Sequence, residues 1–271
     1  MNGELRAYGA LFRLRMAAGL HYRSSVFGEV ICRFIWIFME ILAYHALFRA
    51  APNGFPLGLE QTVSYVWLQQ TTFVLFKIVF SDNEIYDSIN SGGIAYELVR
   101  PMGLYERWFY SAAANRLSYT LVNALPVIAV GLLLPPGWGL AKPATLSVLG
   151  LSFVSAALGL GATAAVALLM FNTLFITISH RGIKIIFTAV TDFLSGGVIP
   201  LVFFPSSIRR LVQLSPFAAM RDTPLAIYTG SYTFSQSLAA MGLQLFWLVV
   251  LVLLGKFWMK RLLNRLVVQG G

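Results

Sequence analysis

The sequence predicts an all-α integral membrane protein with six transmembrane helices. Of its 271 residues, 58% are hydrophobic and only 11% are charged, whereas soluble domains contain about 25% charged residues. The apolar residues gather in six runs, each near or above the roughly 20 residues that a helix needs to cross a bilayer. This composition leaves too little polar surface to cover a soluble globule, so we expect the chain to be embedded in a membrane.

The runs indicate a single transmembrane domain over residues 1–271. The predicted spans are residues 30–48, 63–80, 117–134, a stretch within 144–178, 183–204 and 238–258. They group as spans one to three in 29–134, spans four and five in 144–204, and span six with a cytoplasmic tail in 238–271. The fourth run is too long for one crossing and too short for two. We therefore expect one span there that continues as a helix into the cytoplasm and loosens near Asn172 and Thr173.

Lysine and arginine residues predict the orientation of these spans. They are more numerous in the two termini and in the loops after spans two and four than in the other loops. Because positive residues gather on the cytoplasmic side of a membrane, we expect both termini in the cytoplasm. The same preference explains the net charge of +9, so this charge does not indicate a nucleic-acid partner.

Residues 1–28, before the first span, are predicted to include an amphipathic helix that lies on the inner membrane surface. Apolar and aromatic side chains recur at helical spacing on one side, and arginines flank the other. The apolar side carries Leu5, Tyr8, Leu11, Phe12 and Met16.

The segment 81–110, between spans two and three, carries both signs of charge densely. Gly92 and Gly93 interrupt the helical pattern, and residues 94–99 can form one or two helical turns. Pro101 ends these turns, because a proline disfavours helix in the residue before it. A short, stiff, charged element between two spans is suited to receive force from a separate subunit, so we expect a coupling helix here.

The segment 205–237, between spans five and six, is unusually apolar for a free loop. A short helix is predicted from Ser206 or Ser207 to Leu214. A second element is predicted from Phe217 towards Gly230, interrupted by Pro224. We expect this part to re-enter the outer leaflet, which requires other protein to cover its backbone.

Motifs for nucleotide, metal or nucleophilic chemistry are absent from the sequence. It contains no G-x-x-x-x-G-K-[ST], H-E-x-x-H, C-x-x-C or G-x-S-x-G, and its single cysteine excludes an internal disulfide. The three histidines belong to separate segments, which does not favour a shared metal site. We therefore expect a chain that is not itself an enzyme and that holds no cofactor or metal.

Two carboxylates are predicted to lie deep in the membrane, Glu40 in the first span and Asp192 in the fifth. A charge at that depth costs about 2.5–3.5 kcal/mol on insertion scales, and it requires a polar partner or a water-filled path. Lys77, in the second span, is one candidate partner. Either these residues form structural pairs, or they line a translocation path for cationic or amphipathic cargo.

Two groups of motifs resemble type 2 ABC exporter permeases. Gly93 followed by Glu97, Leu98, Arg100 and Pro101 is similar to the G-x-x-x-E-L-L-R-P-type segment after the second span of that family. Its signature around the fifth span and the outer segment is similar to Ser195-Gly196-Gly197-Val198-Ile199-Pro200-Leu201, Phe204-Pro205, Leu214-Ser215-Pro216-Phe217, Thr223-Pro224 and Gly230. The resemblance covers essentially the whole chain, and it is closest to drug or natural-product exporters.

The resemblance implies a multi-pass protein of the bacterial inner membrane that pairs with a second permease, either a copy or a related chain. It also implies a cytosolic ATPase subunit, which binds ATP and Mg, and which contacts the N-terminal helix, the coupling helix and the loop after span four. The residues assigned in this way to ATPase coupling are Gly92, Gly93, Ile94, Glu97, Leu98, Arg100, Pro101, Arg107, His180 and Arg181. An outer gate is implied at Pro200, Pro205, Pro216 and Phe217.

Some alternatives stay open at the level of sequence. Glu97 and Arg100 either contact the ATPase or form an intrahelical ion pair. The small residues at fourfold spacing in span four either pack within the chain, which we favour, or form a dimer face. The competing functions are an ion-gradient-driven secondary transporter, although no internal repeat is evident, and a membrane-embedded lipid-modifying enzyme, although no clustered acid–base set is evident.

Overall fold

The structure, a computed structural model, describes residues 2–20, 26–51, 54–80, 83–90, 93–100, 102–177 and 180–264. These residues form helices joined by turns and loops, and no strand occurs among them. Four helices are long and apolar enough to cross a membrane, namely α2 (Val26–Ala50), α6 (Leu104–Leu133), α7 (Leu146–Leu174) and α12 (Phe234–Leu263). The predicted all-α membrane protein is confirmed to this extent.

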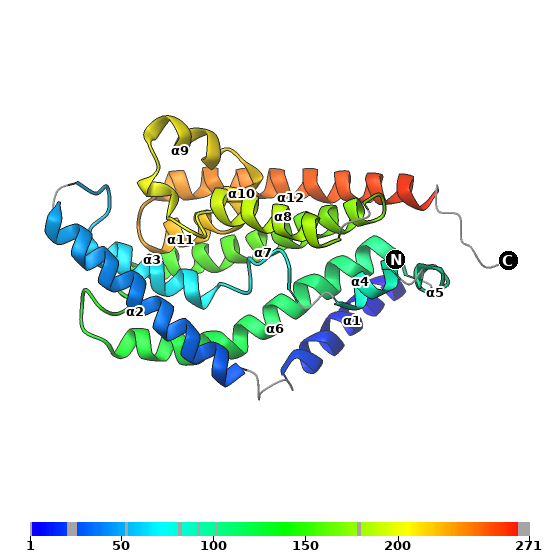
Figure 1. The fold of residues 1–271 in the computed structure, drawn as a ribbon, viewed down its shortest axis with the longest axis horizontal. Coiled ribbons are helices and arrows are strands. Elements are labelled where there is room, and N and C mark those ends of the chain that lie inside the picture. The colour runs from blue at the N-terminus through cyan, green and yellow to red at the C-terminus, as the bar shows by residue number, and fades with distance from the viewer. Residues whose placement is uncertain are drawn as a thin grey trace.

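Helix α7 forms the centre of the bundle (Figure 1). It lies beside α12, and α6 and α11 (Asp222–Tyr228) also pack against it. A Cβ added at Gly159 of α7 would lie only 2.2 Å from the carbonyl oxygen of Met220. Ser155 and Thr163, on the same row of small residues, are fully buried. This row therefore allows close packing within the chain, as the favoured interpretation of the sequence predicted.

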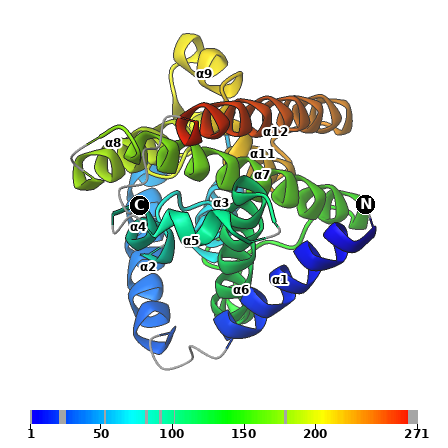
Figure 2. The ribbon, with the colours of Figure 1, turned by 90° about the vertical axis from the view of Figure 1, so that its right-hand side faces the viewer.

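Helix α1 (Asn2–Leu20) lies along α6 (Figure 2). The ring of Tyr8 stacks on that of Tyr110 with their centroids 5.2 Å apart, and Phe12 is half-buried. Arg6 and Arg13 are exposed on the other side. The predicted helix and its two faces are thus present, and the apolar face lies against α6. Its place on a lipid surface stays a prediction.

The predicted second span is not one continuous helix. Helix α3 (Leu59–Thr71) has 13 residues, and residues 72–80 continue in turns and bends. At 1.5 Å per residue, α3 is about 20 Å long, shorter than the roughly 30 Å hydrocarbon core.

Two buried arginines bind backbone carbonyl groups where the chain leaves α3. Arg33 of α2 donates to the carbonyl oxygen of Gln70 at 2.7 Å. Arg116 of α6 donates to the carbonyl oxygens of Lys77, at 2.9 Å, and Ile78. Buried backbone carbonyls need such partners, so irregular backbone is stable here because neighbouring helices supply donors.

The predicted fifth span also departs from a single helix. Helix α8 (His180–Leu194) has 15 residues, which corresponds to about 22 Å. It ends before Gly196, whose φ of 76° lies in the left-handed region that favours glycine. A short 3-10 helix, η1 (Leu201–Phe203), follows. The crossing of the membrane by these two shorter helices, and hence the number six, stays a prediction.

The outer segment contains α9 (Ser206–Gln213), α10 (Pro216–Met220) and α11. The first matches the predicted helix, and Pro216 begins α10, which the Ser215 hydroxyl caps. The predicted interruption at Pro224 is wrong. The chain changes direction at Arg221 instead, and Pro224 lies in the first turn of α11, where its missing N–H removes no helical hydrogen bond.

The segment 81–110 contains α4 (Asn83–Asn90) and α5 (Ile94–Leu98). Helix α5 confirms the predicted short helix, whereas α6 already begins at Leu104, well before the predicted third span. Figure 1 places α4, α5, the start of α1 and the end of α12 at one end of the molecule. Helix α9 and the end of α2 lie at the other end. This arrangement agrees with the expectation that the termini and the coupling loop share one side.

Candidate functional site

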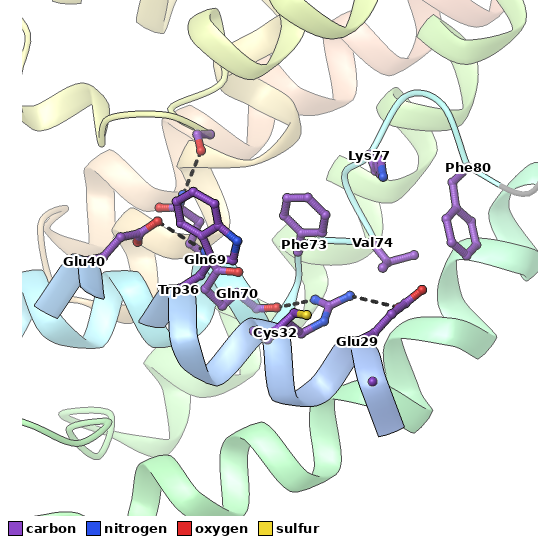
Figure 3. A pocket seen from close by; sticks show the side chains of 13 residues that line it. Glu29, Cys32, Trp36, Glu40, Gln69, Gln70, Phe73, Val74, Lys77 and Phe80 are labelled. Atoms are coloured by element: carbon purple, nitrogen blue, oxygen red, sulfur yellow. Dashed lines mark hydrogen bonds and ion pairs between the residues drawn. The ribbon is translucent and has the colours of Figure 1, made fainter. Parts of the chain in front are cut away.

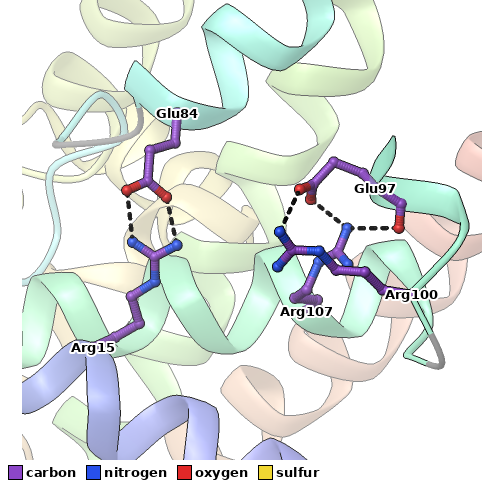
Figure 4. A network of polar contacts seen from close by, with 5 residues as sticks. All are labelled: Arg15, Glu84, Glu97, Arg100 and Arg107. Atoms are coloured by element: carbon purple, nitrogen blue, oxygen red, sulfur yellow. Dashed lines mark hydrogen bonds and ion pairs between the residues drawn. The ribbon is translucent and has the colours of Figure 1, made fainter. Parts of the chain in front are cut away.

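A network of ion pairs joins α1, α4, α5 and α6 (Figure 4). Both terminal nitrogens of Arg15 on α1 contact the carboxylate of Glu84 on α4. Arg107, in the first turn of α6, pairs with the carboxylate of Glu97 on α5 and donates to its carbonyl oxygen at 3.1 Å. Charge-assisted contacts of this kind are stronger than neutral hydrogen bonds, so they tie the short helices to the longer ones.

Glu97 is the central acid of this network. Its second carboxylate oxygen lies 3.7 Å from Arg100, which gives the intrahelical pair that the sequence suggested. The contact with Arg107 is closer, and the Arg107 side chain is buried whereas that of Arg100 is mostly exposed. The main role of Glu97 in the structure is therefore to fix α5 on α6.

Glu84 has an altered acidity because of Arg15. The hydrogen bonds from Arg15 lower the pKa of the Glu84 carboxyl, and burial only partly opposes this effect. The same contact raises the pKa of Arg15. The ionised pair is therefore favoured in the folded state.

The surface of α5 differs from the predicted one. Ile94, which the resemblance assigned to ATPase coupling, is only 5% exposed and packs in the main core cluster. Leu98 is exposed as expected, and the more exposed apolar residues are Tyr96 at 83% and Val99 at 85%. Neither residue was predicted as a contact from the sequence, although a one-turn helix with one buried side must expose its other side chains.

The other predicted coupling residues are placed only in part. Gly93 stands at the N-cap position of α5, and Gly92 and Pro101 lie outside the described residues. His180 begins α8, but its side chain is outside the described part of the chain. Arg181 is exposed in the first turn of α8. Among the described residues, α8 and α5 do not pack extensively against each other.

A cavity of about 610 Å³ lies between α2 and the segment that runs from the end of α3 to Phe80 (Figure 3). Glu40 and Lys77, two of the predicted path residues, both line it, and Gly197 forms part of its wall. A volume of this size falls in the range of small-molecule sites. The wall also carries the aromatic side chains of Trp36, Phe73 and Phe80.

Glu40 and Lys77 do not form the pair that was considered from sequence. Glu40 accepts a hydrogen bond of 3.3 Å from the side-chain amide of Gln70. The Lys77 ammonium lies 5.4 Å from the centroid of the Phe73 ring. Neither has an ion-pair partner within 4.0 Å among the described residues.

Asp192, the third predicted path residue, lies elsewhere. Its carboxylate is 3.6 Å from the guanidinium of Arg221, which is buried. A Cβ added at Gly197 would lie 1.8 Å from a terminal nitrogen of Arg221, so the glycine makes room for this side chain. Asp192 therefore has an ion-pair partner within the chain, as the structural alternative requires, and its role in a translocation path stays a prediction.

The polar cluster around Arg221 was not predicted from the sequence. Arg221 was counted with the positive residues of the outer segment 205–237, whereas it and Asp222 are almost fully buried. The hydroxyl of Tyr65 donates to the Asp222 carboxylate at 3.0 Å, and the Gln69 amide donates to the carbonyl oxygen of Gly197 at 2.8 Å. The high apolar content around Arg221 was the available signal that this arginine lies inside the protein.

The predicted outer-gate residues lie at or near the starts of short helices. Pro200 precedes η1, Pro205 precedes α9, and Pro216 begins α10. Phe217 is half-buried and packs against the main core cluster. Each proline therefore marks the start of a short helix, and a role in gating stays a prediction.

Comparison with known protein families gives an independent result. A family model described as "ABC-2 family transporter protein" matches residues 34–270, which is most of the chain and includes the cavity residues from Trp36 onwards and the coupling segment. A search of curated proteins gave no match. The matched length, the apolar helices and the earlier motif resemblance lead to one conclusion: the chain belongs to the ABC-2 transporter family, whose members are the membrane components of ABC transporters.

Proposed function

We propose that the chain is the membrane-spanning permease of an ATP-driven exporter and forms half of the translocation path. The observation that carries this proposal is the arrangement of α5, which exposes Tyr96 and Val99 while Glu97 fixes it to Arg107 of α6. A helix that exposes apolar side chains to a partner and is bound to a long helix on its other side can transmit force. A separate ATPase subunit, which binds ATP and Mg, supplies that force.

The chain also connects the coupling helices to the cavity. Phe73, Val74, Lys77 and Phe80 line the cavity, and α4 begins three residues after Phe80. Movement of α4 and α5 therefore reaches the cavity wall along a short stretch of backbone. Arg116 holds the middle of this stretch to α6 through the carbonyl oxygens of Lys77 and Ile78.

A second permease, a copy or a related chain, is proposed to complete the path. Helix α2 exposes a row of large apolar side chains beside the cavity, namely Ile31, Ile35, Trp36, Met39 and Leu42. Such a face requires lipid or protein to cover it. A facing permease would cover the row and enclose the open side of the cavity.

Family membership favours this function over the two alternatives. An ion-gradient-driven transporter or a lipid-modifying enzyme would act without an ATPase partner, whereas members of this family are parts of ABC transporters. The role as an exporter, the outward direction and the bacterial inner-membrane location rest on the resemblance of the motifs, and both termini are proposed to lie in the cytoplasm.

Substitution of Val99 tests the docking surface. Tagged chain purified in mild detergent is expected to bring down a P-loop ATPase that mass spectrometry identifies. Val99→Asp places a charge in the proposed apolar contact and is expected to reduce ATPase recovery at least about tenfold, since desolvating a charge costs more than 1.4 kcal/mol. ATP-dependent cargo movement in vesicles should fall in parallel.

Leu133→Asp is the matched control, because Leu133 is 86% exposed at the opposite end of α6. It should leave ATPase recovery unchanged. Equal recovery with Val99→Asp and the parent chain would overturn the assignment of α5. Uphill transport by the purified chain alone would overturn the proposed function itself.

A further inference from the structure

A groove between α1, α6 and α7 is separate from the cavity beside α2. It has a volume of about 380 Å³, within the range of small-molecule sites. Its wall includes Tyr8 and Phe12 of α1, Phe109 of α6, and Ala157 and Gly161 of α7. No acidic or basic side chain is among its described lining residues. An uncharged, mostly apolar wall of this kind suits a hydrocarbon ligand.

The groove extends from α1 to the middle of a membrane-spanning helix. Phe109 lies in the second turn of α6, whereas Ala157 and Gly161 lie near the middle of α7. Ala157 is exposed, so the groove is open to the surroundings of the bundle. A ligand that follows the groove would run from the level of α1 into the apolar interior of the membrane, as an acyl chain does.

A basic side chain lies at the edge of the groove. The exposed side of α1 reaches the groove at Gly9, which is one of its lining residues. The Nε of Arg13 donates to the carbonyl oxygen of Gly9 at 3.4 Å. The two terminal nitrogens of this guanidinium have no hydrogen-bond or ion-pair partner among the described residues. A guanidinium in this position can bind a phosphate group by charge-assisted hydrogen bonds.

The position of the groove favours lipid as its occupant. Figure 2 places α1 and α2 on opposite sides of α6. A second permease that covers α2 would therefore leave the groove open to the bilayer. Amphipathic helices with arginine on the polar face lie at the membrane surface and attract anionic lipids. One basic group beside an apolar groove matches an anionic head group joined to a hydrocarbon chain.

We propose that the groove holds an acyl chain of an anionic phospholipid, such as phosphatidylglycerol, whose head group binds Arg13. The uncharged wall accepts the chain of any phospholipid, because it carries no group that recognises a head group. Arg13 supplies the selectivity and favours the anionic lipid about fivefold, which corresponds to about 1 kcal/mol for a basic residue near the membrane surface. The inference depends on the location of the chain in a membrane, and it is independent of its cargo and its ATPase.

Two photoreactive lipids with identical acyl chains test the site, a phosphatidylglycerol and a phosphatidylcholine that each carry a diazirine on the chain. The full-length protein in phosphatidylcholine nanodiscs is irradiated with a trace of either probe, and mass spectrometry locates the cross-linked residues. Cross-links should concentrate on residues 109–113 of α6 and 157–161 of α7, which contain the lining residues of these helices. The phosphatidylglycerol probe should label them about fivefold more than the phosphatidylcholine probe.

Two variants separate the head group from the chain. Arg13→Gln should reduce labelling by the phosphatidylglycerol probe to the level of the phosphatidylcholine probe, because it removes the charge that distinguishes them. Ala157→Phe fills the groove and should reduce labelling of the groove by both probes to the level of the other apolar helices. The matched controls Arg261→Gln on α12 and Ala189→Phe on α8 are at exposed positions outside the groove and should leave the labelling unchanged.

Gly9→Phe keeps the test decisive if Ala157→Phe disturbs the fold. It fills the groove from α1, where an added Cβ would meet no atom within 4 Å. We expect it to lose the labelling of the groove while it keeps the Tm of the parent chain, and retained labelling would overturn the site. Cross-links spread evenly along the apolar helices would show a general lipid belt only and would also overturn it. Equal labelling of the groove by the two probes would reject the anionic head group at Arg13.

Discussion

Arginines in two parts of the molecule have different partners. At the end that carries α4 and α5, Arg15 and Arg107 meet the carboxylates of Glu84 and Glu97. Beside the cavity, Arg116 is fully buried and its described hydrogen bonds all go to backbone carbonyl oxygens. One group of arginines joins separate helices, whereas the other supports a stretch of chain that is not helical.

The difference indicates which part can rearrange. The pair between Arg15 and Glu84 lies near solvent, so salt weakens it and it can exchange partners at little cost. Buried carbonyls that lose a donor have no water to replace it, so the contacts of Arg116 resist change. We therefore expect the contact between α1 and α4 to adjust when a partner pushes, while the segment after α3 keeps its shape and moves as a unit.

Among the substitutions that test this comparison, Arg116→Leu is expected to cause the largest loss of stability. This change leaves the carbonyl oxygens of Lys77 and Ile78 without this donor, whereas the Ala112 carbonyl keeps its hydrogen bond within α6. One buried unsatisfied group costs about 1–3 kcal/mol, so the sum is about 2 kcal/mol or more, and Tm should fall by at least about 4 °C. Thermal unfolding of the purified chain in detergent measures it. Arg181→Leu, at an exposed position, is the control, and an equal loss for both variants would contradict the comparison.

Hydropathy and periodicity were sufficient to predict many of the helices. Helices α2, α7 and α12 follow from long apolar runs, and α5 follows from the spacing of glycine and proline around it. The end of α3 could not be predicted in this way. It depends on donors from Arg33 and Arg116, which lie 37 and 39 residues away in sequence from the carbonyls that they bind. No local pattern reports a contact between such distant residues.

The candidate site, too, could be predicted from the sequence only where it depends on residues close together in the chain. The coupling segment was located from its charges and its glycines, but the sequence left open whether Glu97 pairs with Arg100 or contacts the ATPase. The structure adds Arg107, whose position depends on how α5 folds back onto α6. Arg221 was counted with the positive residues of the outer segment, because a count of charges by loop does not tell a buried arginine from an exposed one. Its burial beside Asp192 follows only from the packing of α10 and α11.

Glu97→Gln is expected to have a smaller effect, which is confined to the local stability of α5. The amide keeps the shape of the side chain but removes the charge that faces Arg107, whose side chain is buried. A charge-assisted contact of this kind contributes about 1.5–3 kcal/mol, so α5 should open more often. Hydrogen exchange of residues 94–98 should accelerate about tenfold or more, while exchange in α7 stays unchanged. Glu60→Gln is the control, and equal acceleration throughout the bundle would show that Glu97 supports global stability instead.

The smallest effect concerns the ion pair between Arg15 and Glu84, because the Glu84 side chain is largely exposed. Arg15 lowers the pKa of Glu84 below its ordinary value of 4.5. The stabilisation from this pair is therefore fully present above pH 4.5 and is lost as the pH falls through the lowered pKa.

Spin labels on Leu14→Cys and Asn83→Cys, in a Cys32→Ser background, report the distance between α1 and α4. The distribution of distances should be narrow at pH 7 and broaden on acidification below about pH 4.5. With Glu84→Gln it should be broad at every pH, because the amide cannot titrate. A distribution that stays narrow in this variant would mean that the stacking of Tyr8 on Tyr110 holds α1 without the ion pair, and the coupling end would then be less adjustable than its charges suggest.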